Sequence, residues 1–174
     1  MKYFYVGATP DVEREAFTAI RERVVAGFGL PVRDADLPGM EFAFDSGRNQ
    51  YGSTAVLAML ARRCPPDARK LLAITGRDLF IPVLTFVFGH AQLGGPVAVI
   101  SLARLRQEFY RLPPDREVLL ARAWKEALHE IGHTFGLVHC VDRSCAMSLA
   151  TNVRQIDLKQ AAYCAECLRR IPRE

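Results

Sequence analysis

Residues 129–139 read HEIGHTFGLVH, which is the pattern H-E-x-x-H-x-x-G-x-x-H and contains three of the four histidines of the chain. His129 and His133 are four residues apart, so on a helix they lie on one face, one turn above the other. Gly136 lets the chain leave that helix through a left-handed conformation, because glycine has no Cβ. His139 can then turn back to the same point. The spacing therefore predicts that three imidazoles meet at one metal ion.

Glu130 gives this predicted metal site a chemical role. It follows His129 directly and lies about 100° further round the helix, where its carboxylate reaches the side of the ion without binding it. Three protein ligands and one open position are typical of a catalytic zinc site rather than a structural one. The alternative is a histidine pair on an ordinary helix, but the full pattern should arise by chance in only about one such chain in a hundred thousand.

A second metal site is indicated by the cysteines. Cys140, Cys145, Cys164 and Cys167 form a C-x4-C…C-x2-C arrangement, which favours a structural zinc in four-thiolate coordination. Two disulfides are the alternative, which an intracellular setting disfavours, and a redox-active C-x-x-C pair fits less well. The fifth cysteine, Cys64, has no partner in the sequence and is expected to be a half-buried small hydrophobic residue.

The two predicted metal sites adjoin each other, because Cys140 follows His139. A zinc ion on the four cysteines would fix the loop that brings His139 to the first metal. We expect a last helix to begin near Asp157, with Gln160 completing a capping box, and to carry Cys164 and Cys167. The structural zinc would then attach this helix beneath the first site.

Length and composition bound the remaining choices. The chain has 174 residues, half of them hydrophobic, and a formal net charge of +4. This fits one domain, residues 1–174, with an N-terminal lobe at about 1–136 and a C-terminal lobe at about 137–174. Scattered basic residues favour a solvated surface over a nucleic-acid footprint, and no apolar run is long enough to cross a membrane. We expect a cytoplasmic monomer that binds neither nucleic acid nor membranes.

The chain before the histidines predicts a mixed α/β fold of the α+β class. Strands are expected at 2–7, 30–32 (running on towards Ala35), 40–44, 70–75, 84–89 and 96–101, and helices after the N-caps Thr9, Ser53 (or Thr54) and Asp115. The nearly continuous apolar run at 70–75 is typical of a central strand covered on both faces. The last two strands are close enough to form an antiparallel edge. The loop between them contains His90, which we expect to be a loop residue rather than a ligand.

These motifs resemble the metzincin metallopeptidases, in which the histidine motif is followed by a methionine turn. Met147, between Cys145 and the last two cysteines, is in the position of that methionine. More specifically, the chain is similar to the archaemetzincins, which join the histidine motif directly to four cysteines with Cys-x-Met in the middle. The resemblance implies a metzincin-type domain with a twisted mixed sheet, three main helices and a zinc helix forming the floor of a cleft. It also implies that Met147 supports the histidines from below.

We therefore predict a zinc-dependent peptidase with two zinc ions per chain, one catalytic and one structural. His129, His133 and His139 would hold the first ion, and Glu130 would be the general base for a zinc-activated water. The substrate would be a peptide or a protein. The alternatives are a non-catalytic zinc-binding interaction module, or a peptide-binding protein with little turnover. The presence of Glu130 argues against the module, because metal binding alone does not require it.

Overall fold

A five-stranded sheet forms the centre of the computed structural model, which describes residues 1–172. In spatial order its strands are β2 (Val32–Asp36), β1 (Tyr3–Ala8), β5 (Ala68–Thr75), β8 (Val97–Ser101) and β7 (Gly89–Ala91). The first four are parallel, and β7 is antiparallel to β8 at one edge. The predicted mixed sheet with an antiparallel edge strand is confirmed.

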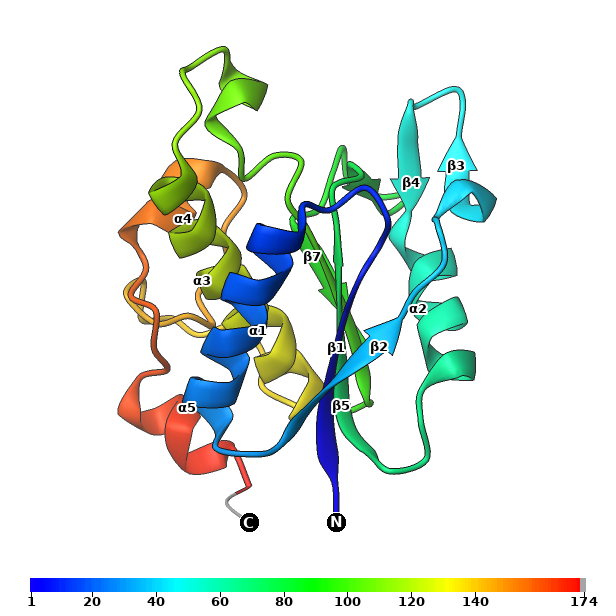
Figure 1. Ribbon diagram of the computed structural model, residues 1–174. Helices are drawn as coiled ribbons and strands as arrows, with labels where there is room; N and C mark the ends of the chain where they lie inside the picture. The colour runs from blue at the N-terminus through cyan, green and yellow to red at the C-terminus, as the bar shows by residue number, and fades with distance from the viewer. Residues whose placement is uncertain (173–174) are drawn as a thin grey trace.

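Helices cover both faces of this sheet (Figure 1). α1 (Arg14–Phe28) and α3 (Arg116–Thr134) pack on one face, and α2 (Ser53–Arg63) packs on the other. Strand β5 shows why both faces are apolar. Its Leu72 and Ile74 face α1 and α3, whereas Leu71 and Ala73 face α2. These are the three longest helices of the described chain, as predicted, and α3 carries His129 and His133.

A second, smaller sheet of three strands was not predicted. It consists of β3 (Phe44–Asp45), β4 (Gln50–Gly52) and β6 (Leu79–Phe80). The strand predicted at 40–44 is wrong over most of its length, because residues Glu41–Ala43 form the 3₁₀ helix η1. Met40 and Ala43 are both buried, and their spacing of three matches a 3₁₀ turn rather than a strand.

The strand predicted at 84–89 is also wrong, since β7 begins only at Gly89. The preceding segment, residues 81–88, is mostly irregular because side chains bind its carbonyl groups. Arg48 donates to the carbonyls of Pro82 and Leu84 at 3.2 and 3.1 Å, and Gln50 donates to that of Thr85 at 3.0 Å. The segment therefore leaves the main sheet and forms one wall of a cleft.

The predicted N-caps have different outcomes. Asp115 caps α3 as predicted, accepting a hydrogen bond from the Val118 amide at 3.0 Å. Thr9 does not cap α1, which begins at Arg14, because its hydroxyl is bonded to Thr75 of the sheet. Ser53 is the first residue of α2, and its hydroxyl donates to the Phe80 carbonyl instead of capping the helix.

The C-terminal region contains two short helices instead of the single one predicted from Asp157. α4 (Val153–Leu158) is capped by Asn152, and α5 (Ala165–Arg170) follows a non-helical segment. That segment is held by the loop 140–147, here called the metal loop because it carries Cys140 and Cys145. The Gln160 amide donates to the Ser144 carbonyl, and the Ala146 amide donates to the Ala162 carbonyl. The link between β8 and α3 contains the 3₁₀ helix η2 (Gln107–Tyr110).

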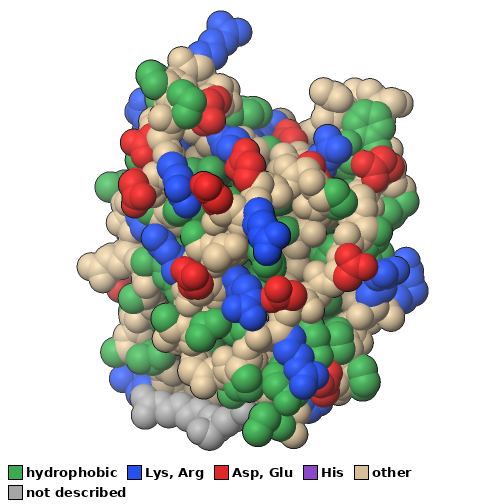
Figure 2. Space-filling view, in the orientation of Figure 1, with side chains coloured by type: hydrophobic (Ala, Val, Ile, Leu, Met, Phe, Trp, Pro, Cys, Tyr) green, Lys and Arg blue, Asp and Glu red, His purple; other side chains and the backbone are tan. Residues whose placement is uncertain are grey.

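The surface shown in Figure 2 carries acidic and basic side chains side by side over α1 and its surroundings, and no single-sign patch is visible on that face. Within residues 1–172, no helix has the length and apolar character needed to cross a membrane.

Candidate metal centres and active site

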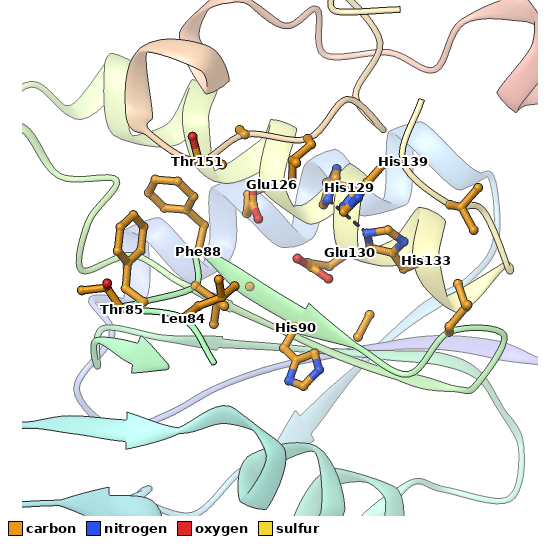
Figure 3. Close-up of a pocket in the computed structure, with 18 residues that line it drawn as sticks. Leu84, Thr85, Phe88, His90, Glu126, His129, Glu130, His133, His139 and Thr151 are labelled. Atoms are coloured by element: carbon orange, nitrogen blue, oxygen red, sulfur yellow. Dashed lines mark hydrogen bonds between the residues drawn. The ribbon is translucent and has the colours of Figure 1, made fainter. Parts of the chain in front are cut away.

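The three motif histidines meet at one point. His129 and His133 lie one turn apart near the end of α3, and Gly136 then adopts a left-handed conformation with φ of 86°. This turn brings His139 back towards the helix, so that one ring nitrogen from each histidine lies within 4.8 Å of the other two. The structure thus produces the grouping that the sequence predicts, and Figure 3 shows the three rings converging above the sheet.

Backbone carbonyls fix the orientation of two of the rings. His129 Nδ1 donates to the Ala146 carbonyl at 2.8 Å, and His133 Nδ1 donates to the Leu137 carbonyl at 2.7 Å. In the neutral rings each Nε2 is then unprotonated, and these two nitrogens are 3.1 Å apart. Two lone pairs at this distance repel each other, and a metal cation held by both nitrogens would relieve the repulsion. Tetrahedral zinc, with Zn–N bonds of about 2.0–2.1 Å, places two nitrogens about 3.3 Å apart, so the site fits zinc.

The surroundings keep these imidazoles neutral. Burial lowers the pKa of His129 well below its usual value, and the positive charge of Lys159 adds to this effect. Burial also lowers the pKa of His133 and of His139. Neutral imidazole is the form that binds a metal, so the histidines are prepared for binding without losing a proton.

Glu130 lies at the floor of the cleft beside the histidines. Its side chain is buried, and Glu126, also buried, lies one helical turn earlier on α3. Burial, followed by the charge of Glu126, raises the pKa of Glu130 well above its usual value. A divalent cation at the histidines would oppose this effect, because a nearby positive charge favours the carboxylate.

Gly89 makes room for Glu130. A Cβ at position 89 would lie 2.6 Å from Glu130 Cγ and 2.7 Å from its Oε1. Strand β7 therefore passes so close to the carboxylate that only glycine fits there.

We expect Gly89→Ala to displace the Glu130 carboxylate and to lower kcat by about 10–100-fold, since misplacing a reacting group by about 1 Å has effects of this size. Zinc content should not change. Gly52→Ala is the matched control, because a Cβ there would meet no atom closer than 3.7 Å. Steady-state kinetics on both variants, with zinc analysis, make the comparison. Equal kcat values in the two variants would contradict the role given to Gly89.

The cleft above the histidines is a cavity of about 560 Å³. Polar groups lie at its floor, and apolar side chains form most of its walls (Figure 3). The apolar lining residues are Leu84, Phe86, Val87, Phe88, Ala91, Leu93, Val138, Leu149 and Ala150. Several of them come from the irregular segment 81–88 and from the loop before α4, so both sides of the cleft present apolar surface to a bound molecule.

His90 is not part of the metal group, as expected, although it lies in β7 rather than in a loop. Its Nδ1 is 2.9 Å from the Ser53 hydroxyl, and its ring lies on the opposite side of the strand from Glu130 (Figure 3).

The four clustered cysteines also meet at one point. Their four Sγ atoms all lie within 4.8 Å of one another; they belong to Cys140, Cys145, Cys164 and Cys167. The Sγ atoms of Cys140 and Cys164 are 3.8 Å apart, which is about the distance between two thiolates on a tetrahedral zinc with Zn–S bonds of about 2.3 Å. All five cysteines are free, so the structure favours the metal over the two disulfides. Cys64 is half-buried against the α2 side of the core, as expected.

The two metal groups are joined by packing beneath α3. Met147 is fully buried, and its sulfur occupies the space that a Cβ on Gly132 would need. Tyr163, next to Cys164, donates from its hydroxyl to the Leu128 carbonyl of α3 at 2.6 Å. Met147 thus lies under the histidine helix, as the resemblance to the metzincins implies, whereas the contact of Tyr163 with the helix was not predicted.

The comparisons with known proteins agree with this geometry. Residues 67–173 match the model of the family described as Peptidase family M54. The chain belongs to this family. As a member, it is a zinc metallopeptidase, a hydrolase that acts on peptides or proteins.

Several archaemetzincins resemble the chain over most of its length. The archaemetzincin of Methanocaldococcus jannaschii is 41% identical over 165 residues, which cover 92% of this chain and 88% of the relative. That of Natronomonas pharaonis is 34% identical over 170 residues, covering 95% of each. Among solved structures, a zinc-dependent peptidase from Methanocorpusculum labreanum has a TM-score of 0.87 and is 32% identical, covering 97% of this chain and 100% of that chain.

An archaemetzincin from Archaeoglobus fulgidus, solved in complex with malonate, has a TM-score of 0.85 and is also 32% identical. The match covers 97% of this chain and 99% of that one. The fold predicted from the resemblance to archaemetzincins is therefore confirmed.

Proposed function

We propose that the cleft hydrolyses peptide bonds with a zinc ion held by His129, His133 and His139, and with Glu130 as the general base. The observation that carries the proposal is the pair of Nε2 atoms of His129 and His133, which lie 3.1 Å apart beside the buried Glu130. A second zinc ion would be held by Cys140, Cys145, Cys164 and Cys167, giving two per chain.

The roles of the residues follow from their positions. Zinc, when bound, supplies Lewis-acid activation of water and of the scissile carbonyl. The Glu130 carboxylate accepts the proton of the attacking water, and the resulting carboxylic acid then donates it to the amine of the leaving peptide. The carbonyls of Ala146 and Leu137 hold His129 and His133 in the tautomer that leaves Nε2 free. Met147 supports the helix and takes no part in proton transfer.

The apolar walls of the cleft favour peptides with large apolar side chains near the scissile bond, because such side chains would be removed from water on binding. Membership of the peptidase family argues against the alternative of a non-catalytic zinc-binding module. Four further properties stay predictions: that the chain is one domain, that it is a monomer, that it is cytoplasmic and that it binds no nucleic acid. Sedimentation analysis would test whether it is a monomer.

Metal analysis combined with a peptide-library digest distinguishes the enzyme from the module. We expect two zinc ions per chain, and cleavage that a chelator abolishes and that added zinc restores. Mass spectrometry of the digest should show apolar residues enriched beside the cleaved bonds. One thiolate-bound zinc ion and an uncleaved library would instead support the interaction module.

A further inference from the structure

Lys159 is buried next to the proposed active site although its side chain is charged. It follows α4 directly, is 4% exposed, and does not belong to any motif in the sequence. Its Nζ donates to the Ala146 carbonyl at 3.3 Å. The same oxygen accepts the hydrogen bond from His129 Nδ1 at 2.8 Å. Lys159 and His129 thus donate hydrogen bonds to the same carbonyl oxygen.

The charge of Lys159 also acts on two buried carboxyl groups, those of Glu126 and Glu130. Glu126 and Glu130 are buried one helical turn apart on α3. Two carboxylates this close repel each other, and in a buried site water cannot screen the repulsion. The positive charge of Lys159 acts on both carboxyl groups and opposes the effect of burial on them. In return, both carboxylates oppose the lowering of the Lys159 pKa by burial.

We propose that Lys159 is a positioning residue of the active site: it holds the Ala146 carbonyl that orients His129, and its charge allows Glu126 and Glu130 to lie side by side. Buried lysines are rare unless they are paired, so the placement of this one needs such a reason. The inference rests on the proposed function, because the value of orienting His129 depends on a metal at the histidines. The balance of charge with Glu126 does not depend on the metal.

The first test measures zinc affinity at the histidines by chelator competition. Lys159→Met keeps most of the length of the side chain and removes its charge and hydrogen bond. We expect it to weaken zinc binding at the histidines by about 10–100-fold, the usual effect of losing a partner of a ligand, and to lower kcat more than it changes KM. Lys159→Arg should recover most of the loss. Zinc at the cysteines should be unaffected.

Lys125→Met is the matched control. Lys125 donates to the carbonyls of Ile156 and Asp157, so it contacts the same short helix without reaching Ala146. If Lys159→Met and Lys125→Met retain the same zinc affinity and kcat as the unmodified protein, the positioning role is wrong.

The second test measures the unfolding of the zinc-loaded protein in a double-mutant cycle. In the Glu126→Gln background, Lys159→Met should change the unfolding equilibrium constant about fivefold less than in the unmodified chain, because the excess negative charge is already reduced. The double variant should fold even if Lys159→Met alone does not. Equal effects in both backgrounds, or loss of folding in the double variant, would show a packing role only and overturn the proposal.

The two tests separate the failure of this inference from the failure of the proposed function. If the unmodified protein holds no zinc at the histidines, the proposed function fails, whatever the double-mutant cycle shows. If it holds zinc there and Lys159→Met leaves both affinity and the cycle unchanged, only the role of Lys159 fails.

Discussion

Replacing Glu130 with Ala or Gln should remove peptide hydrolysis while leaving both zinc ions and the fold in place. We expect kcat to fall by about 10²–10⁴-fold, the contribution usual for a general base. The Gln variant is the sharper test, because it keeps the size and the polarity of the side chain. What it loses is the ability to take a proton from water.

The control for this variant is Glu117→Gln. Glu117 lies in the first turn of the same helix, α3, and is exposed, so the same change of charge occurs far from the cleft. It should leave kcat unchanged. Metal analysis and circular dichroism of both variants would confirm that zinc and fold are retained. Turnover by Glu130→Gln at the rate of the unmodified protein would show that another group takes the proton.

The residues of both metal groups could be predicted because their spacing is local. Three histidines within eleven residues, with Gly136 between the second and third, leave one arrangement in which a helix and a left-handed turn bring them together. The cysteine pairs are similarly short. Central strands such as β5 were predicted for the same reason, since a nearly unbroken apolar run needs no information from the rest of the chain.

The errors occurred where distant side chains determine the backbone. Segment 81–88 reads as a strand, but Arg48 and Gln50 bind its carbonyl groups from a hairpin more than 30 residues earlier. The single helix predicted from Asp157 is wrong because the residues after Lys159 form hydrogen bonds with the metal loop instead of continuing a helix. Local patterns carry no information about such partners.

The site residues that were not predicted divide into one that local spacing could have revealed and three that only long-range packing brings to the site. Glu126 lies four residues before Glu130, so the helical periodicity that places Glu130 in the cleft also places Glu126 there, and it could have been found. Gly89, Lys159 and Tyr163 reach the site only through packing between segments far apart in the chain. Nothing in their immediate sequence distinguishes them from ordinary glycine, lysine and tyrosine residues.

Cys145→Ser should cause the largest loss of stability of any single substitution considered, together with a loss of metal at both sites. Cys145 is buried, and its sulfur accepts hydrogen bonds from the amides of Met147 and Cys164 at 3.4 and 3.3 Å. Removing this thiolate leaves three ligands for the structural zinc. We expect the free energy of unfolding to fall by at least about 3 kcal/mol, because the binding energy of a structural zinc is also folding energy. The midpoint of thermal unfolding should then fall by about 6–12 °C.

The histidine site should be weakened as well, because the cysteine loop holds the residues around it. Cys140 directly follows His139, and its amide donates to the Met147 carbonyl at 2.9 Å, so a loosened loop would release both His139 and the support beneath α3. Cys64→Ser is the matched control, since Cys64 is half-buried and lies outside the cluster; it should cost less than about 1 kcal/mol. Thermal unfolding and zinc analysis of the two variants compare them directly. If both lose the same stability and both keep two zinc ions, the cysteine cluster does not support the active site.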